Sequence, residues 1–414
     1  MIHQNRRKEL LSQLDDGALV IISTNPEQLR NGDVHYPFRP HSDFWYLTGF
    51  TEPQAVAVFS KDTYTIFLRD KDPAREIWDG KRLGVSDAPQ ALKADKAYSI
   101  DELKTQLPKL IADATTLYYD FKPCTLDDEI IQHLAKTQYQ SLATYAHEMR
   151  LIKDAGEIEL MQKAADISVN AHQLAMQQTH ADLLEFEVAS VFDAEFRKNN
   201  AEHAYTPIVA GGENACVLHY IENNKVLNDG DLLLIDAGCE VEGYASDITR
   251  TFPVNGTFSK AQRQIYQIVL DAQLAAIESI KPGVMVVKPH QIATHVIQQG
   301  LIDLGILQAD GDLSQFYMHG TGHYLGLDVH DVGTYQKNDQ HRQYETGMVT
   351  TVEPGIYIRK DDKINPIYWG IGIRIEDDVL ITNNGNTVLT GALVKEIDDI
   401  ESLMRERNEY TASN

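Results

Sequence analysis

Short apolar runs alternate with polar stretches from residue 18 to about residue 121. The runs ALVIIS, AVAVFS, YTIFLR and TLYYDF have the length and composition of strands. Lys61-Asp62 separates two of them in the manner of a hairpin turn, and the longer polar stretches between the others are compatible with helices. The pattern therefore predicts a small α/β domain.

The pattern changes near residues 150 to 155, where a longer, helical period begins. The segment GEIELMQKAADISVNAHQLAMQQ places its apolar side chains on one helical stripe. A second helix, DLLEFEVASVFDAEFRKN, follows, with Asp182 in position to be its N-cap. We therefore expect two domains, residues 1–150 and residues 151–414.

The second domain repeats one order of elements. Its first two helices are followed by the apolar segments DLLLIDAG and ASDITRTFPV, which have the spacing of an antiparallel pair. A helix capped by Ser259 and ended by Lys281-Pro282-Gly283 comes next, then a further helix to about Gly305 and strands at MVTTVEPGIYI and IGIRIEDDVLIT. This order indicates an internal duplication, and a site between the two halves is its natural consequence.

Composition adds limits on partners and location. The 414 residues exceed what one hydrophobic core usually serves, and 43% hydrophobic with 24% charged residues is typical of a soluble globular protein. The 61 acidic and 37 basic residues give a formal charge of -24, which repels nucleic-acid phosphates and anionic lipid surfaces. The first apolar run, Ala18 to Ile22, is too short for a signal peptide or a membrane span. We therefore expect a cytoplasmic protein with neither a nucleic-acid nor a membrane partner.

The three cysteines, Cys124, Cys216 and Cys239, are an odd and widely scattered set. Such a set favours reduced thiols over a disulfide framework. No C-x-x-C pair in the sequence suggests a zinc knuckle, and the absence of H-E-x-x-H removes the motif of a single-zinc protease.

Acidic residues at the ends of apolar strands are the first sign of chemistry, because a buried carboxylate is costly unless it is paired, hydrogen-bonded or bound to a metal. Asp236 ends LLLID and Asp247 opens the partner strand, so the two can face each other across a hairpin. Glu353 closes MVTTVE, and Glu376 lies in IGIRIED, where strand geometry places Arg374 on the same face. Each acid alone is equally well explained as a turn residue, an ion-pair partner or a loop cap. Four together favour a cation site.

Histidines gather in the same half of the chain. The segment His319-Gly-Thr-Gly-His323 supplies two imidazoles, and its glycines favour a loop over a helix. We interpret His290 and His295, which lie in a predicted helix, as non-catalytic. The candidates that remain are His219, His319, His323 and His330.

Four segments that carry these residues resemble the metal motifs of the aminopeptidase P and prolidase group of metallopeptidases: IDAGCEVEGYASDITRTFPV, MHGTGHYLGLDVHDVG, TVEPGIYI and GIRIEDDV. YPFRPHSDFWYLTGFTEPQAV and GGENACVLHYIEN resemble aminopeptidase P more narrowly, so the similarity spans nearly the whole chain. The resemblance implies an α/β chain of the α+β type. Its small N-terminal domain, of the creatinase and aminopeptidase P kind, should contain a mixed sheet. Its C-terminal "pita-bread" domain should contain a curved, mainly antiparallel sheet that helices cover with pseudo-twofold symmetry.

Five residues match the metal ligands of the group: Asp236, Asp247, His323, Glu353 and Glu376. The resemblance implies two divalent ions, with Glu353 and Glu376 completing and bridging the pair. Four carboxylates and one imidazole suit hard cations, and the resemblance favours Mn²⁺, although the ligands alone also permit Co²⁺ or Zn²⁺. Two such ions would balance the four negative charges and lower the pKa of a shared water.

The resemblance implies an Xaa-Pro aminopeptidase, a hydrolase that removes the N-terminal residue from peptides with proline in second position. Our hypothesis for its mechanism is attack of a metal-bridging hydroxide on the scissile carbonyl, with Glu353 as proton shuttle to the leaving nitrogen. His330 would then steady the oxyanion. The pattern of the group places His219 and His319 around the residue after the scissile bond, with Tyr357 and Arg374 behind them.

Members of the group also close the active site with residues of the N-terminal domain, some of them from a neighbouring subunit. This habit makes Asp33, Trp78 and Arg150 secondary candidates for substrate binding. For Trp78 we favour packing in the core. The habit also implies a homo-oligomer, a tetramer or alternatively a dimer.

Two other functions are compatible with the same scaffold. Prolidase shares all five ligands and acts on Xaa-Pro dipeptides, but the N-terminal resemblance favours aminopeptidase P. A non-catalytic binding protein could retain the pita-bread shell, and creatinase shows that the shell can host metal-free chemistry. Both should lack some of the ligands, and this chain lacks none.

Overall fold

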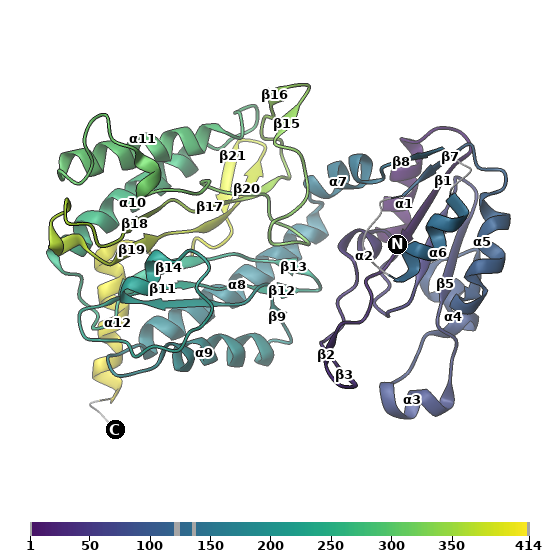
Figure 1. The fold of residues 1–414 in the computed structure, drawn as a ribbon, viewed down its shortest axis with the longest axis horizontal. Helices are drawn as coiled ribbons and strands as arrows, with labels where there is room; N and C mark the ends of the chain where they lie inside the picture. Colours follow the sequence, from purple (N-terminus) through teal and green to yellow (C-terminus); the bar gives the residue numbers. More distant parts are fainter. Residues whose placement is uncertain (1, 120–124, 135–137, 412–414) are drawn as a thin grey trace. The chain divides into compact units, whose positions relative to one another are not determined.

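The computed structural model describes residues 2–119, 125–134 and 138–411. The chain divides into two compact units, Met1–Met149 and Arg150–Asn414 (Figure 1). Each unit combines sheets with helices, which confirms the predicted α/β class.

The first unit contains a six-stranded mixed sheet in the order β6-β5-β4-β1-β7-β8. Strand β1 pairs antiparallel with β4 and parallel with β7. Strands β4 and β5 form the predicted hairpin, in which Phe59 lies opposite Tyr64 around Lys61-Asp62. The strands are Ala18–Ser23 (β1), Val56–Phe59 (β4), Tyr64–Leu68 (β5), Lys96–Ser99 (β6), Thr116–Tyr118 (β7) and Tyr139–Gln140 (β8).

Helices cover this sheet because its apolar side chains, such as Ile21, Val56 and Phe67, are fully buried. The same unit contains an exposed hairpin of Leu29–Asn31 (β2) and Val34–His35 (β3). Its helices are Ile2–Ser12 (α1), Ser42–Thr48 (α2), Pro73–Asp79 (α3), Gly84–Leu92 (α4), Leu103–Ile111 (α5) and Thr125–Leu134 (α6), and Ala143–Leu151 (α7) runs across the boundary between the units.

The second unit begins with two long helices, Ala155–Gln178 (α8) and Glu185–Lys198 (α9). Helix α8 starts with a capping box. The predicted cap of α9 is wrong: the N-cap is Leu184, and Asp182 lies earlier in a turn with φ of 72°. Asp182 cannot cap the helix because a cap needs extended backbone at the residue directly before the helix.

The predicted order of two helices and then strands occurs a second time. Ser259 caps Lys260–Ser279 (α10) as predicted, and Lys288–Asp303 (α11) follows. Helix α8 lies alongside β12 and β13, and α10 lies alongside β17, β18 and β19 (Figure 1). The chain closes with Ile397–Thr411 (α12).

The strands of the second unit pair antiparallel, as predicted, in several short sheets. The first set comprises Glu202–His203 (β9), Ile208–Gly211 (β10), Leu232–Asp236 (β11), Cys239–Val241 (β12), Tyr244–Ala245 (β13) and Thr249–Pro253 (β14). The second set comprises Gln336–Lys337 (β15), Gln340–His341 (β16), Val349–Val352 (β17), Gly355–Ile358 (β18), Ile371–Arg374 (β19), Asp377–Thr382 (β20) and Gly385–Val388 (β21).

The thiols of Cys216 and Cys239 are free, as predicted, and both are buried, whereas Cys124 lies outside the described residues. Among the helices that the structure describes, none is both long and apolar enough to cross a membrane.

Candidate metal centre

One cavity of about 260 Å³ in the second unit brings most of the predicted site together. All five predicted ligands line it, and so do four of the predicted neighbours, although these residues are spread over more than half of the unit. The lining comprises Leu218, His219, Asp236, Asp247, His319, Gly320, Gly322, His323, His330, Glu353, Arg374 and Glu376.

Asp236 and Asp247 approach each other differently from the predicted hairpin. Asp236 ends β11 and is paired with Thr249 on β14, whereas Asp247 lies two residues before β14, after the inserted strands β12 and β13. The hydroxyl of Tyr205 joins the two acids, lying 2.6 Å from Asp236 Oδ1 and 2.5 Å from Asp247 Oδ1. Nothing in the sequence pattern pointed to Tyr205, because it lies in a loop and shares no strand with either acid.

The loop that carries His323 is fastened to β17, the strand that ends before Glu353. The amide of Thr351 donates to the carbonyl of His323 (2.9 Å), and the amide of Glu353 donates to the carbonyl of Thr321 (2.7 Å). This segment forms no helix, as predicted. Gly322 is required here, because a Cβ at this position would collide with the carbonyl oxygen of Thr351.

Arg374 and Glu376 both line the cavity, as expected, although the strand is interrupted between them. Arg374 ends β19, and Glu376 lies in the break before β20. The guanidinium of Arg374 instead pairs with Asp236, with Nη2 lying 2.5 Å from Oδ2, and it donates to Thr249 Oγ1 (3.0 Å). Thr249 in turn donates to Glu376 Oε2 (2.7 Å), so a threonine joins the two residues.

The donor atoms fit a divalent cation. One ligand atom each from Asp247, His323 and Glu376 lies within 4.8 Å of the others. His323 Nδ1 lies 3.0 Å from the carbonyl oxygen of Tyr324, a partner that leaves Nε2 directed at the acids. Carboxylates with one imidazole form a donor set that Mn²⁺, Co²⁺ and Zn²⁺ all accept.

The electrostatics of the cluster also fit a cation. Burial, followed by the charges of Asp247, Glu353 and Asp236, raises the pKa of Glu376 well above its ordinary value. Burial likewise raises the pKa of Glu353 to about 7, against the opposing charges of His323 and Arg374. Carboxylates that hold protons at these pKa values lack positive charge around them, and a divalent ion would supply it.

His323 supplies part of that charge. Burial alone would lower its pKa, but the hydrogen bond and the charge of Asp247 outweigh burial and raise it to about 9. Its Nε2 lies 3.4 Å from Asp247 Oδ2 and 3.8 Å from Glu353 Oε1. A metal ligand must offer this nitrogen unprotonated, so an ion would take the place of the proton.

The predicted neighbours surround the same cavity. His319 Nε2 lies 2.9 Å from the hydroxyl of Tyr357, which accepts a hydrogen bond from Arg374 Nη1 (3.0 Å). Burial first, and then the charge of Arg374, lowers the pKa of His319 to about 4. The rings of His330 and His323 meet edge to face with centroids 4.2 Å apart. His290 lies behind this loop, with Nδ1 2.9 Å from Thr321 Oγ1, and His295 is exposed on α11.

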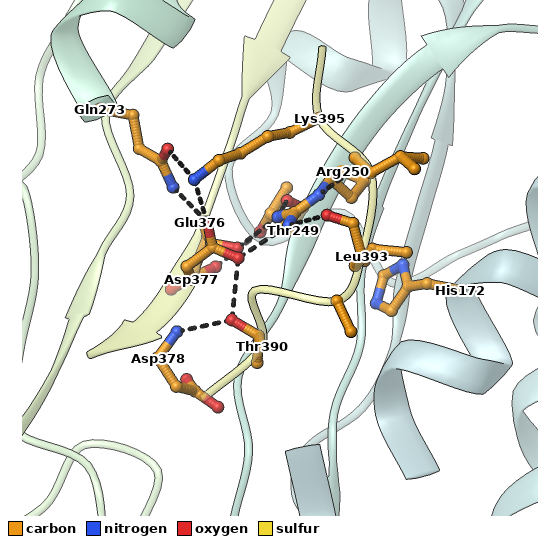
Figure 2. A network of polar contacts seen from close by, with 12 residues as sticks. His172, Thr249, Arg250, Gln273, Glu376, Asp377, Asp378, Thr390, Leu393 and Lys395 are labelled. Atoms are coloured by element: carbon orange, nitrogen blue, oxygen red, sulfur yellow. Dashed lines mark hydrogen bonds and ion pairs between the residues drawn. The ribbon is translucent and has the colours of Figure 1, made fainter. Parts of the chain in front are cut away.

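A second buried network lies directly behind Glu376 (Figure 2). Arg250 and Asp377 form a fully buried ion pair of 2.7 Å, and Lys395 Nζ lies 2.7 Å from the other oxygen of Asp377. Arg250 Nη1 also donates to the main-chain carbonyls of Glu376 (2.6 Å) and Thr249 (3.0 Å). Arg250 and Asp377 lie inside apolar segments of the sequence, a pattern that indicates a buried ion pair.

Arg150 is buried in a group of ion pairs. Only 2% of its surface is exposed, and its guanidinium lies 2.5 Å from Asp331 Oδ1 and 2.8 Å from Asp328 Oδ2. Lys153 Nζ lies 3.0 Å from the other oxygen of Asp331. These contacts join Arg150 and Lys153 to the segment next to His330.

Asp33 and Trp78 belong to the first unit and are exposed. Asp33 lies in the turn between β2 and β3. Trp78 on α3 is 82% exposed, as is its neighbour Ile77, so the expectation that Trp78 packs in a core is wrong. The reason is local: no residue of α3 is buried.

Comparison with known families identifies both parts of the chain. The family described as "Metallopeptidase family M24" matches residues 159–383, and "Aminopeptidase P, N-terminal domain" matches residues 3–118. The Xaa-Pro aminopeptidase of Haemophilus influenzae is 48% identical over 97% of this chain and 96% of its own.

Solved structures agree in fold over the whole length. Escherichia coli aminopeptidase P, as a variant in complex with substrate, superposes with a TM-score of 0.95 at 40% identity, over 99% of this chain and 98% of its own. The zinc-substituted E. coli enzyme in complex with product has a TM-score of 0.95 at 41% identity, over 98% of each chain. This agreement confirms the predicted pita-bread architecture.

Proposed function

From the premise that this chain belongs to metallopeptidase family M24, and within it to the aminopeptidase P group, we propose that it is a dinuclear-metal Xaa-Pro aminopeptidase. It would remove the N-terminal residue from peptides whose second residue is proline. The relatives described above are named for this activity. We assign the N-terminal domain to residues 1–150 and the catalytic domain to residues 151–414.

One observation carries the proposal: all five proposed ligands line a single cavity. The ligands would be Asp236, Asp247, His323, Glu353 and Glu376. Four carboxylates balance two divalent ions, and the oxygen-rich set favours Mn²⁺, with Co²⁺ or Zn²⁺ as alternatives. When bound, such ions polarise a carbonyl and lower the pKa of water, so that hydroxide is available near neutral pH.

We assign the proton transfers to Glu353. Its carboxylate lies between two imidazoles, with Oε2 3.7 Å from His319 Nδ1 and Oε1 3.8 Å from His323 Nε2. From this position it can take a proton on the cavity side and deliver it to the leaving nitrogen. His330, on the other side of His323, would donate toward the developing oxyanion.

Proline recognition would rest on shape, because an Xaa-Pro amide has no N–H to grip and its ring fixes φ. His219 and His319 line the cavity and would border the proline ring. Tyr357 and Arg374 hold His319 in place through the hydrogen bonds described above. The same Arg374 also fixes Asp236.

One comparison tests the function and separates it from prolidase. The purified chain, after chelation and with or without added Mn²⁺, is offered an Xaa-Pro dipeptide and an Xaa-Pro-Yaa tripeptide. We expect release of the N-terminal residue from the tripeptide, and only with metal. Release from the dipeptide alone would favour prolidase, and activity that resists chelation would contradict the metal site.

We also propose a homo-oligomer, with a tetramer favoured over a dimer, and action in the cytoplasm, where the free thiols of Cys216 and Cys239 stay reduced. The exposed side chains of Ile77 and Trp78 and the exposed turn at Asp33 are compatible with contacts to a neighbouring subunit near a substrate. A fully active monomer in analytical ultracentrifugation would contradict any need for a neighbour.

A further inference from the structure

Glu185 is a fully buried acid at the first position of α9. Its carboxylate accepts four hydrogen bonds, two on each oxygen. The donors to Oε1 are Gly211 N (2.8 Å) and Asn214 Nδ2 (2.9 Å), and the donors to Oε2 are the Tyr220 hydroxyl (2.8 Å) and Lys225 N (2.9 Å). The acceptor capacity of a carboxylate is thereby filled.

All four donors belong to one segment, residues 211–225. They are two main-chain amides, one side-chain amide and one phenol, so neutral groups replace the hydration of a buried negative charge. The amide of Glu185 also donates to the carbonyl of Lys225 (2.9 Å). A single side chain thus fastens this segment at its start, its middle and its end.

The segment needs such fastening where it passes the cavity. Residues 217–224 form neither helix nor strand, and most of them are exposed. Two of their side chains turn inward: Tyr220 reaches Glu185, and Asn223 accepts from Val209 N (2.9 Å) and donates to the carbonyl of Pro207 (2.9 Å). His219, next to Tyr220, lines the cavity between these anchors and the ordered turn Gly212–Cys216.

We propose that Glu185 is a positioning residue for substrate specificity, which sets the place of the His219 imidazole through Tyr220. The inference rests on the proposed function, in which His219 borders the residue after the scissile bond. The four donors to the Glu185 carboxylate belong to the segment, and no proposed metal ligand is among them. Loss of this carboxylate should therefore disturb substrate binding and leave the bound metal unchanged.

The substitution Glu185→Gln tests this role with minimal change of shape. Glutamine offers one oxygen and a donating amide, so two of the four donors would lose their acceptor. Glu187→Gln is the matched control, because it makes the same change in the same helical turn. The Glu187 side chain is exposed, and Gln still accepts the hydrogen bond from the amide of Leu184 (2.8 Å).

The kinetic measurement is kcat/KM for an Xaa-Pro-Yaa tripeptide in Mn²⁺, together with metal content by elemental analysis. We expect Glu185→Gln to lower kcat/KM about tenfold, mainly through KM, at unchanged metal content. Glu187→Gln should match the wild type. In a His219→Ala background the further effect of Glu185→Gln should shrink to less than about twofold, because both changes act on one imidazole.

A purely structural role for Glu185 gives different results. Effects of Glu185→Gln and His219→Ala that multiply in the double variant would overturn the proposal, and so would a Glu185→Gln enzyme with wild-type KM. If Glu185→Gln fails to fold, Tyr220→Phe removes one of the four hydrogen bonds and should show the same dependence on His219 with a smaller effect.

Hydrogen exchange separates this inference from the proposed function. In Glu185→Gln, amides of residues 217–224 should exchange faster, while those of β11 and β14 stay unchanged. Equal exchange at residues 217–224 in variant and wild type would overturn the positioning role. A wild-type chain that cleaves no Xaa-Pro peptide would instead refute the proposed function.

Discussion

Glu376 and Asp377 are neighbours in the sequence and both are buried, yet their carboxylates have opposite surroundings. Glu376 faces three further acids across the cavity, and burial together with their charges raises its pKa well above the ordinary value. Asp377 faces Arg250 and Lys395, whose charges outweigh burial and lower its pKa to about 2. Two residues adjacent in the sequence therefore belong to two different electrostatic environments.

The difference separates a charge-balanced network that stabilises the fold from a cluster of acids that can bind a cation. In the network around Asp377, Arg250 and Lys395 supply the positive charge that the buried carboxylate needs (Figure 2). The cluster around Glu376 lacks enough positive charge, because Arg374 and His323 are the cations that touch it, against four carboxylates. An incomplete charge balance of this kind marks a place for a ligand cation.

The largest expected effect comes from a substitution in the acidic cluster around Glu376. Glu353→Gln should retain bound metal but lower kcat by about a thousandfold, because glutamine cannot carry a proton to the leaving nitrogen. Elemental analysis and initial rates on one preparation measure both quantities. Near-normal turnover of the metal-loaded variant would contradict the proton role.

Substitutions in the network around Asp377 should change the free energy of unfolding rather than catalysis. Arg250→Met leaves Asp377 buried with one cation fewer, which should lower the free energy of unfolding by about 3–5 kcal/mol. Arg197→Met is the control, since Arg197 makes an exposed ion pair with Glu202 and its loss should cost less than about 1 kcal/mol. Urea unfolding measures both, and equal losses would show that burial of the pair is unimportant.

In the metal-free protein, the Glu353→Gln substitution should raise the stability of the fold. Because the pKa of Glu353 is raised from 4.5 to about 7, the metal-free folded chain binds a proton more tightly than the unfolded chain. Stability is therefore lost as pH rises from 4.5 to about 7, by up to about 3 kcal/mol. Glu353→Gln should be the more stable protein in EDTA at pH 8, by urea unfolding, with exposed Glu345→Gln as the control. Equal stability of variant and wild type would show that the acid is compensated without metal.

A further pH-dependent effect is expected at His172, which is fully buried. Burial lowers the pKa of this histidine to about 3. Below pH 6.5 the unfolded chain therefore binds a proton at this position that the folded chain does not bind. Stability should fall by about 1.4 kcal/mol for each pH unit between 6.5 and about 3. His172→Gln, which can still donate to the carbonyl of Ala237, should flatten the acid side of the stability curve, whereas exposed His180→Gln should not. Parallel curves for the wild type and His172→Gln would contradict this assignment.

The sequence predicted most of the element order because period and caps are local properties. The hairpin around Lys61-Asp62, the cap at Ser259 and the loop at His319 to His323 all follow from neighbouring residues. The cap at Asp182 failed because a turn precedes α9, a feature that spacing alone does not reveal.

The site was predicted as a set of residues but not as a geometry. Strand alternation joined Arg374 to Glu376, yet the strand breaks between them, and Arg374 reaches Asp236 from another sheet. Tyr205 was missed because its contacts with Asp236 and Asp247 depend on tertiary structure. The exposure of Trp78 could not be predicted either. In the sequence, a short helix with no buried side chain has the same pattern as a short helix that packs against a core.

The two sets of strands also determine when, during synthesis of the chain, the site can assemble. Asp236 and Asp247 come from the first set, whereas His323, Glu353 and Glu376 come from or near the second, and Lys395 near the chain end completes the support behind them. A ribosome that has made the first half of the unit has thus made a helix-covered sheet with two acids and no hydrolytic centre. Peptide cleavage should therefore begin only after Glu376 and the segment up to Lys395 have been synthesised.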